Sequence, residues 1–367
     1  MPARVYLTRL NLTYRDGVVL HTATSGAVPA LDELRLIVER DGIVAALGAA
    51  RVNIAYLSGI GAETLVAICA QAVRLVDWTR SWTGIVAGLD AALPDLPAPA
   101  RMLVDMAAAD GAAREAGQPL AVWLGGAVAA RVATNQTLFH ADDATMLSRA
   151  DAYVARGFTD LKLRIGLGDM ADDVRRLGLL RQRFGKRIKL SVDANGSWQQ
   201  AAARQNLAML APFALRYVEQ PISADAWDDL VGLAIDSPVP LMLDESLDSL
   251  ASVERLVASG APMLAHLKLA KLGGLDRLMQ AGRRLQAAGI GVMVGQMNEG
   301  AVSTLAAAHV AIALDAAYCE LYGADGLESD PAGALAYADG RLEVPPGPGL
   351  GLTAHDVTGT VVWEHTA

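Results

Sequence analysis

Short apolar runs alternate with longer amphipathic stretches throughout the second half of the chain. The apolar runs have the length of buried strands and cover residues 131–138, 160–165, 188–193, 215–219, 240–244, 264–269, 290–294 and 316–321. Apolar residues recur at helical spacing in the stretches between them, for example 145–156, 171–184, 224–235, 249–259, 275–288 and 300–313. Eight strands with seven intervening helices predict a parallel (β/α)8 barrel. A doubly wound sheet is the weaker alternative, because no G-x-G-x-x-G motif follows the first strand.

The beginning of the chain follows a different pattern. Residues 4–13 alternate apolar and polar side chains, as a half-buried strand does, and strand-like pieces follow at 17–24 and 33–40. Helical patterns dominate residues 61–118, and the Pro/Gly-rich end of the chain cannot form a ninth βα unit. The expected organisation is an α+β capping domain over residues 1–125, the barrel with the active site over 126–335, and a segment over 336–367 that returns to the cap.

Composition is that of a protein with a large core. Hydrophobic residues make up 53% and charged residues 19%, the opposite of the balance that causes disorder. The net charge of −9 argues against a nucleic-acid or anionic-membrane surface. The N-terminus lacks the apolar core of a signal peptide, and no apolar run reaches the ~18 residues of a transmembrane helix. Cys69 and Cys319 lie far apart in apolar surroundings, which favours free thiols. We expect a soluble, cytoplasmic protein.

Three acidic residues end successive strands of the predicted barrel. Asp193 stands in LSVDAN, Glu219 in RYVEQP and Asp244 in LMLDES, at intervals of 26 and 25 residues. A single acid at a strand end is usually a helix cap or an ion-pair partner. Three in register at the carboxyl ends of adjacent parallel strands favour a site for Mg²⁺, with Mn²⁺ as a possible substitute, because hard cations prefer oxygen ligands.

Cations accompany this row of acids. Lys268 follows Asp244 by 24 residues, in LAHLKLAK. Lys162 and Arg164 are two residues apart on one strand, so both point into the barrel unless they are solvated charges at its end. Lys271 is expected at the surface. A lysine beside a divalent cation suits removal of the proton next to a carboxylate, and burial among cations is expected to lower the lysine pKa.

With these motifs the chain resembles the enolase superfamily, and it is most similar to the muconate-lactonizing-enzyme subgroup. The resemblance covers almost the whole length and includes K-L-R, DAN, VEQP, LDES, LKLAKLGG and the closing GPGLGL. It implies that the metal ligands are Asp193, Glu219 and Asp244. It also implies that Lys268 is catalytic, that Lys162 steadies the substrate carboxylate or enediolate, and that the protein is a homo-oligomer acting on a small carboxylate.

Arg164 departs from the family pattern, in which a second lysine usually stands there as a base. Arginine stays protonated at physiological pH, so it cannot take a proton, although it can bind negative charge. Racemisation usually needs two opposed acid/base groups. The sequence therefore favours one-base chemistry: β-elimination of water from a hydroxylated amino, imino or hydroxy acid, or cycloisomerisation. The alternatives are a racemase or epimerase of N-acyl amino acids or dipeptides, and a non-catalytic ligand-binding relative.

Six further residues are candidates to support the metal ligands or to contact the substrate. They lie beside the ligands or after the last strands: Asn195, Glu245, Asn298, Glu299, Glu320 and Tyr322. An acid at Glu320 suits a substrate amine, which makes an amino or imino acid plausible. The alternative is that Glu320 caps a helix or pairs with a surface arginine.

Overall fold

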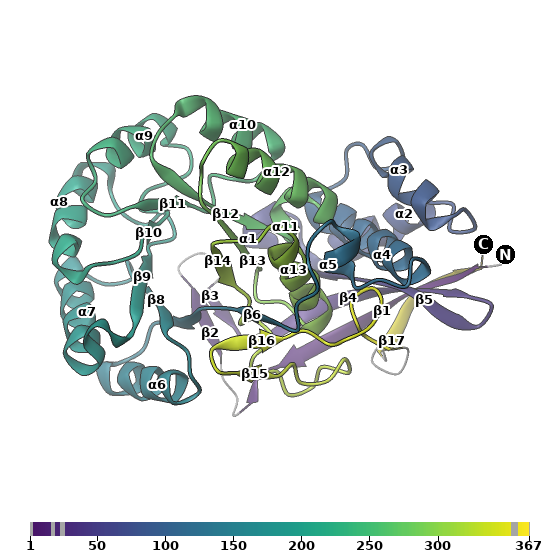
Figure 1. Ribbon diagram of the computed structural model, residues 1–367, viewed down its shortest axis with the longest axis horizontal. Coiled ribbons are helices and arrows are strands. Elements are labelled where there is room, and N and C mark those ends of the chain that lie inside the picture. The colour runs from purple at the N-terminus through teal and green to yellow at the C-terminus, as the bar shows by residue number, and fades with distance from the viewer. Residues whose placement is uncertain (1–2, 16–18, 23–25, 354–358, 367) are drawn as a thin grey trace.

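A computed structural model describes residues 3–15, 19–22, 26–353 and 359–366 (Figure 1). Within these residues, eight strands form one parallel sheet in chain order, which confirms the predicted (β/α)8 architecture. The strands are β7 (Gln136–Leu138), β8 (Asp160–Arg164), β9 (Lys189–Asp193), β10 (Val218–Glu219), β11 (Leu241–Leu243), β12 (Met263–Lys268), β13 (Val292–Gly295) and β14 (Tyr318–Glu320).

Helices cover the outside of these strands, and Figure 1 shows α7 to α10 as an outer arc. The helices that follow the barrel strands are α6 (Asp143–Ala155), α7 (Met170–Phe184), α8 (Gln200–Leu210), α9 (Trp227–Asp236), α10 (Leu250–Ser259), α12 (Leu275–Ala287) and α13 (Ala301–Ala313). Asp142, Asp169 and Ser249 cap three of them, each accepting a hydrogen bond from a backbone N–H in the first turn. Each capping residue fixes where a helix begins after its strand-end loop.

The first barrel strand is shorter than predicted. The run 131–138 is split, because β6 (Arg131–Ala133) pairs with β16 (Arg341–Glu343) and only β7 belongs to the barrel. The β6 residues are half-buried or exposed, whereas all of β7 is buried. Asn135 lies between β6 and β7, and its N–H donates to the carbonyl of Cys319 on β14 at 3.0 Å. This hydrogen bond links the first and last barrel strands and nearly closes the barrel.

An apolar floor fills the barrel below the strand ends. Tyr217, Met242 and Met293 form a separate buried cluster, with Leu264 and Tyr318 packed against it. Tyr217 and Tyr318 meet edge to face, with ring centroids 5.7 Å apart. Charged side chains above this floor therefore face the C-terminal mouth of the barrel rather than a water-filled pore.

The capping unit is an antiparallel sheet backed by helices. Its strands, in spatial order, are β17 (Thr360–Thr366), β1 (Ala3–Thr13), β4 (Ala30–Arg40) and β5 (Ile43–Arg51). Its helices are α2 (Ala62–Arg74), α3 (Trp82–Ala92) and α4 (Ala98–Glu115). Two small hairpins lie outside the main sheets: β2 (Leu20–Thr22) with β3 (Gly26–Val28), and β15 (Tyr337–Ala338) with β16. The predicted strand 17–24 lies partly outside the described residues, and β5 was not predicted.

Buried charges lock the cap to the barrel. Arg101 on α4 donates to the Gly273 carbonyl at 2.8 Å and forms an ion pair with Asp276 at 2.6 Å. Arg51 at the end of β5 donates to the Met297 carbonyl at 2.6 Å. These contacts hold the short helix α1 (Ala55–Ser58) beside the barrel mouth. No helix within the described ranges is long and apolar enough to cross a lipid bilayer.

Candidate metal and proton-transfer site

The three strand-end acids are buried together with their cations at the C-terminal mouth of the barrel. Asp193 and Glu219 are the last residues of β9 and β10 and pair in register, and Asp244 follows β11 directly. None of the three side chains is more than 5% exposed. Buried carboxylates are costly unless they are paired, so the cations around them matter as much as the acids.

Lys162 lies at the centre of the β8 side of the site. Its Nζ is 3.0 Å from Glu219 Oε2 and 3.5 Å from Asp193 Oδ2, and it also forms an ion pair with Glu320. Burial opposes ionisation of Glu320, but the ammonium of Lys162 and the other cations nearby, among them Lys268, together outweigh burial and lower the Glu320 pKa to about 2. Glu320 therefore neither caps a helix nor pairs with a surface arginine, and its charge is balanced inside the barrel.

Arg164, on the same face of β8, is held by two acceptors. Its guanidinium donates to the Asp193 carboxylate and to the side-chain oxygen of Asn195. Asn195, which adopts a positive φ of 46°, donates in turn to Glu245 Oε1 at 3.0 Å. Burial, helped by the charge of Asp244, raises the pKa of Glu245 to about 7. Arg164 is thus part of a hydrogen-bonded chain that leads away from Asp193.

Two lysines meet Asp244 on the β12 side. Lys268 Nζ lies 2.6 Å from Asp244 Oδ2, and Lys271 Nζ lies 2.5 Å from Oδ1. Although burial favours the neutral acid, these ammonium groups lower the Asp244 pKa well below its usual range. Burial favours the neutral amine of Lys268, but Asp244 and other nearby carboxylates outweigh burial and raise its pKa. The expected lowering of the Lys268 pKa is therefore wrong for this arrangement of charges.

The expectation that Lys271 is a surface residue is also wrong. It is 5% exposed and donates to the main-chain oxygen of Asp244 and, at 3.3 Å, to that of His266. Directly after β12 the chain forms the one-turn helix α11 (Leu269–Leu272), which brings this side chain back to Asp244 and into the lining of a pocket at the barrel mouth. Glycines at 273 and 274, both with positive φ, then let the chain pass close to the cap.

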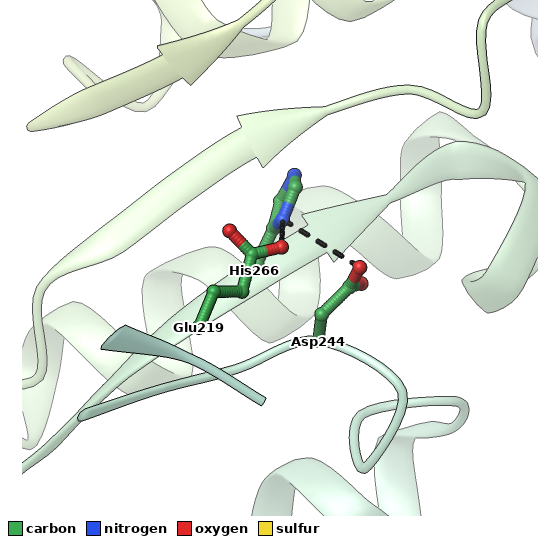
Figure 2. A group of neighbouring side chains, drawn as sticks. All are labelled: Glu219, Asp244 and His266. Carbon is green, nitrogen blue, oxygen red and sulfur yellow. Dashed lines mark hydrogen bonds and ion pairs between the residues drawn. The ribbon is translucent and has the colours of Figure 1, made fainter. Parts of the chain in front are cut away.

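His266 is a site residue that sequence reasoning missed. Its Nδ1 lies 2.8 Å from Glu219 Oε1 and 3.9 Å from Asp244 Oδ2, as the dashed lines in Figure 2 show. Burial, reinforced by the charge of Lys268, lowers the His266 pKa well below its usual value, so the ring is neutral. A signal was present, because His266 stands two residues before Lys268 and so shares its face of the strand.

Gln220 is a second residue that was missed. Its side-chain oxygen accepts hydrogen bonds from the backbone N–H groups of Asp244 and Ser246, at 3.1 and 3.2 Å. It is fully buried and has a positive φ of 34°, directly after Glu219. The amide thus ties the end of β10 to the loop after β11 and fixes two acids relative to each other.

A small pocket of about 90 Å³ opens onto these groups from the cap side. Tyr56 and Leu57 of α1 line it, opposite the charged groups of the barrel. Of the predicted residues, those lining the pocket are Arg164, Asn195, Asp244, Glu245, Lys268, Asn298, Glu320 and Tyr322. Glu299 is buried outside this lining, where it accepts from the Met297 N–H at 3.2 Å, and burial raises its pKa to about 7.

Comparison with known proteins decides the family. Residues 145–357 match the family model described as enolase C-terminal domain-like. The chain is 30% identical to L-Ala-D/L-Glu epimerase of Bacillus subtilis over 257 residues, which cover 69% of this chain and 70% of the epimerase. The chain belongs to the enolase superfamily, in its muconate-lactonizing-enzyme-like subgroup.

Further relatives of this superfamily member carry out other reactions. It is 29% identical over 282 residues to cis-3-hydroxy-L-proline dehydratase of Roseibium aggregatum, with 76% of each chain covered. The crystal structure of muconate lactonizing enzyme from Pseudomonas fluorescens, complexed with muconolactone, superposes with a TM-score of 0.87 at 26% identity and 95% coverage of both chains. This superfamily member is accordingly an enzyme, a lyase or an isomerase.

The donor groups of this superfamily member fit a divalent cation. Ligand atoms of Glu219, Asp244 and His266 all lie within 4.8 Å of one another. Asp193 is not part of that group, because its carboxylate is turned to Arg164 and Lys162. Carboxylate oxygens suit hard cations. A divalent ion would compete with the lysine ammonium groups for the same carboxylate oxygens. Binding of the ion would therefore replace some of the lysine–carboxylate contacts.

Proposed function

We propose that this protein removes the α-proton of a small carboxylic acid through Lys268, in a reaction that depends on a divalent cation. The main support for this proposal is the position of Lys268, whose Nζ lies 2.6 Å from Asp244 at the edge of the pocket. It is the lysine of the site that lines the pocket from the end of a barrel strand, level with Gly295 and Glu320 on the next two strands. Proton transfer gives an enediolate and a protonated lysine.

Asp193, Glu219 and Asp244 are the proposed ligands of the cation, Mg²⁺ or, in its place, Mn²⁺. When bound, such an ion supplies electrophilic stabilisation to the oxygens of the substrate carboxylate. Lys162 holds positive charge beside Glu219 and Glu320, where it balances charge that develops on the substrate. Tyr56 and Leu57 of the cap line the pocket opposite these charged groups.

The reaction proposed for this site uses one base. Arg164 faces the pocket from β8 but stays protonated, and Asp193 and Asn195 hold its guanidinium. β-Elimination of water or cycloisomerisation can proceed from proton removal on one face, and one relative is named a hydroxyproline dehydratase. A dehydratase acting on a hydroxylated amino, imino or hydroxy acid is therefore the specific proposal. Because Lys162 already balances Glu320, a substrate amine is not required.

Epimerisation of dipeptides or N-acyl amino acids is the second candidate, favoured by the similarity to an epimerase. It requires a second acid/base group on the opposite face of the substrate. Arg164 occupies that side in this chain, which argues against it.

Exchange of the α-proton in D₂O tests the proposal. The purified enzyme with Mg²⁺ is incubated with a library of small carboxylic acids, and deuterium at Cα is followed by proton NMR with chiral analysis. We expect exchange with retention of configuration, or loss of water, and neither with Lys268→Met. Exchange with inversion at a rate close to turnover would instead support the epimerase.

A further inference from the structure

His266 is not one of the three strand-end acids, and the proposed proton transfer gives it no role. It is fully buried and comes from β12, one inward-facing position below Lys268. We propose that His266 supplies a nitrogen ligand to the divalent cation held by Glu219 and Asp244, which moves the preference of the site from Mg²⁺ towards transition ions such as Co²⁺. The inference rests on the cation site of the proposed function.

Distances support a shared ion. Bonds from such ions to nitrogen or oxygen are about 2.0–2.2 Å long, so two ligand atoms on one ion lie no more than about 4.4 Å apart. The Nδ1 atom of His266 lies 2.8 Å from Glu219 Oε1 and 3.9 Å from Asp244 Oδ2, within that span. Figure 2 shows the ring edge turned to both carboxylates.

The surroundings of the ring are shaped for it. The backbone of Gly295 on β13 lies against its far edge, and a Cβ at that position would collide with Nε2 of His266. Nε2 is buried without a hydrogen-bond partner in the part of the chain that the structure describes. With Nε2 enclosed against Gly295, Nδ1 is the ring atom that faces the two carboxylates and is placed to bind an ion.

Ligand chemistry gives the direction of the preference. Mg²⁺ takes oxygen ligands in octahedral geometry, whereas imidazole nitrogen strengthens binding of ions later in the first transition row. Adding an imidazole nitrogen to the carboxylate ligands therefore raises affinity for Co²⁺ more than affinity for Mg²⁺. The simpler alternative is that Nδ1–H donates to Glu219 and only orients it, in which case all ions are affected alike.

Pulsed electron paramagnetic resonance of the Mn²⁺-loaded protein tests for the nitrogen directly. The chain has six histidines, and we expect modulation from one bound nitrogen that changes when they carry ¹⁵N. The modulation should vanish in His266→Asn and persist in His309→Asn. His309 is a matched control, buried on α13 with Nε2 also unpartnered among the described residues. Absence of nitrogen modulation in the wild type, or its survival in His266→Asn, overturns the inference.

Calorimetry separates a ligand from an orienting residue. The ratio of the Mg²⁺ to the Co²⁺ dissociation constant should fall about 10-fold or more in His266→Asn. Equal weakening of both ions, or no change, contradicts the inference. If this variant does not fold, the isotope experiment on the wild type decides alone. Nitrogen modulation without α-proton exchange would reject the proposed function but keep this inference, and exchange without modulation would do the reverse.

Discussion

The two sides of the site balance their charge in the same way but differ in what their cations can do. On the β8 side, Lys162 and Arg164 surround Asp193, and on the β12 side, Lys268 and Lys271 surround Asp244. Each carboxylate thus has two cationic neighbours. Only the β12 side places a titratable cation at the pocket, because the pocket residue on the β8 side is an arginine.

Hydrogen bonding sharpens the difference. Arg164 has two side-chain acceptors, Asp193 and Asn195, which hold the planar guanidinium in place. Lys268 has a single hydrogen-bond partner among the described residues, Asp244, and an ammonium group has three donors. The β8 side is therefore built to bind negative charge, and the β12 side to bind it and also exchange a proton. The two sides therefore carry similar charge but differ in their capacity for proton transfer.

Removing the amine of Lys268 has the largest expected effect. Lys268→Met keeps the length of the side chain but has no proton acceptor. We expect α-proton exchange to fall by about 10²–10⁴-fold, the usual contribution of a general base. Exchange measured by NMR is checked against Mg²⁺ affinity, which shows whether the site remains assembled. A variant that retains a tenth of the wild-type rate would show that the base lies elsewhere.

The pH dependence of exchange should reflect one lysine. Lys268 must be neutral to accept a proton, and the carboxylates around it raise its pKa. The neutral fraction therefore grows as pH rises, and kcat/KM for exchange should increase about tenfold per pH unit below that pKa. Saturating Mg²⁺ should move this limb to lower pH, because it offsets the carboxylate charge. A rate that falls from pH 6 to pH 9 would contradict a lysine base.

Arg164→Lys tests the asymmetry from the other side. It keeps a cation next to Asp193 but introduces a group that can lose its proton. We expect exchange on the opposite face of the substrate to rise by about 10-fold or more, seen as loss of configuration at Cα. Arg164→Met is the matched control, because it removes the guanidinium without adding a base. No gain in Arg164→Lys would mean that the position, rather than the arginine, limits the reaction to one face.

The barrel and its row of acids could be predicted from sequence because both depend on local patterns. A buried parallel strand is a short apolar run, and the first polar residue after it marks the C-terminal mouth. Asp193, Glu219 and Asp244 follow this rule. The split of 131–138 could not be predicted. Its first part pairs with β16 and its second part with barrel strand β8, and this change of pairing partner does not alter the hydrophobic pattern of the sequence.

Contacts across the barrel were beyond the reach of sequence spacing. Periodicity gives the face on which His266 points but not that its ring reaches the carboxylate of Glu219 on another strand. A lone histidine in an apolar strand is compatible with ordinary core packing. Lys271 was misplaced for a related reason: the one-turn helix α11 is too short to show a helical period. Both residues act through tertiary geometry.

Lys271→Met is the smallest of the expected effects and the sharpest test of the β12 side. Lys271 donates to the side chain and the main chain of Asp244 but does not end a barrel strand. We expect the free energy of unfolding to fall by about 1–3 kcal/mol, because buried acceptors lose a charged donor. The loss should stay below the roughly 3–5 kcal/mol of a fully unpaired buried charge, since Lys268 still neutralises Asp244.

Denaturant unfolding with a chelator present measures this loss without stabilisation by bound metal. The rate of α-proton exchange in Lys271→Met should change less than about 10-fold, against the 10²-fold or greater loss in Lys268→Met. A fold of unchanged stability whose exchange is as low as in Lys268→Met would mean that the two lysines share the proton. The β12 side would then hold a coupled pair of bases, whereas the β8 side, where Arg164 faces the pocket, would still hold none.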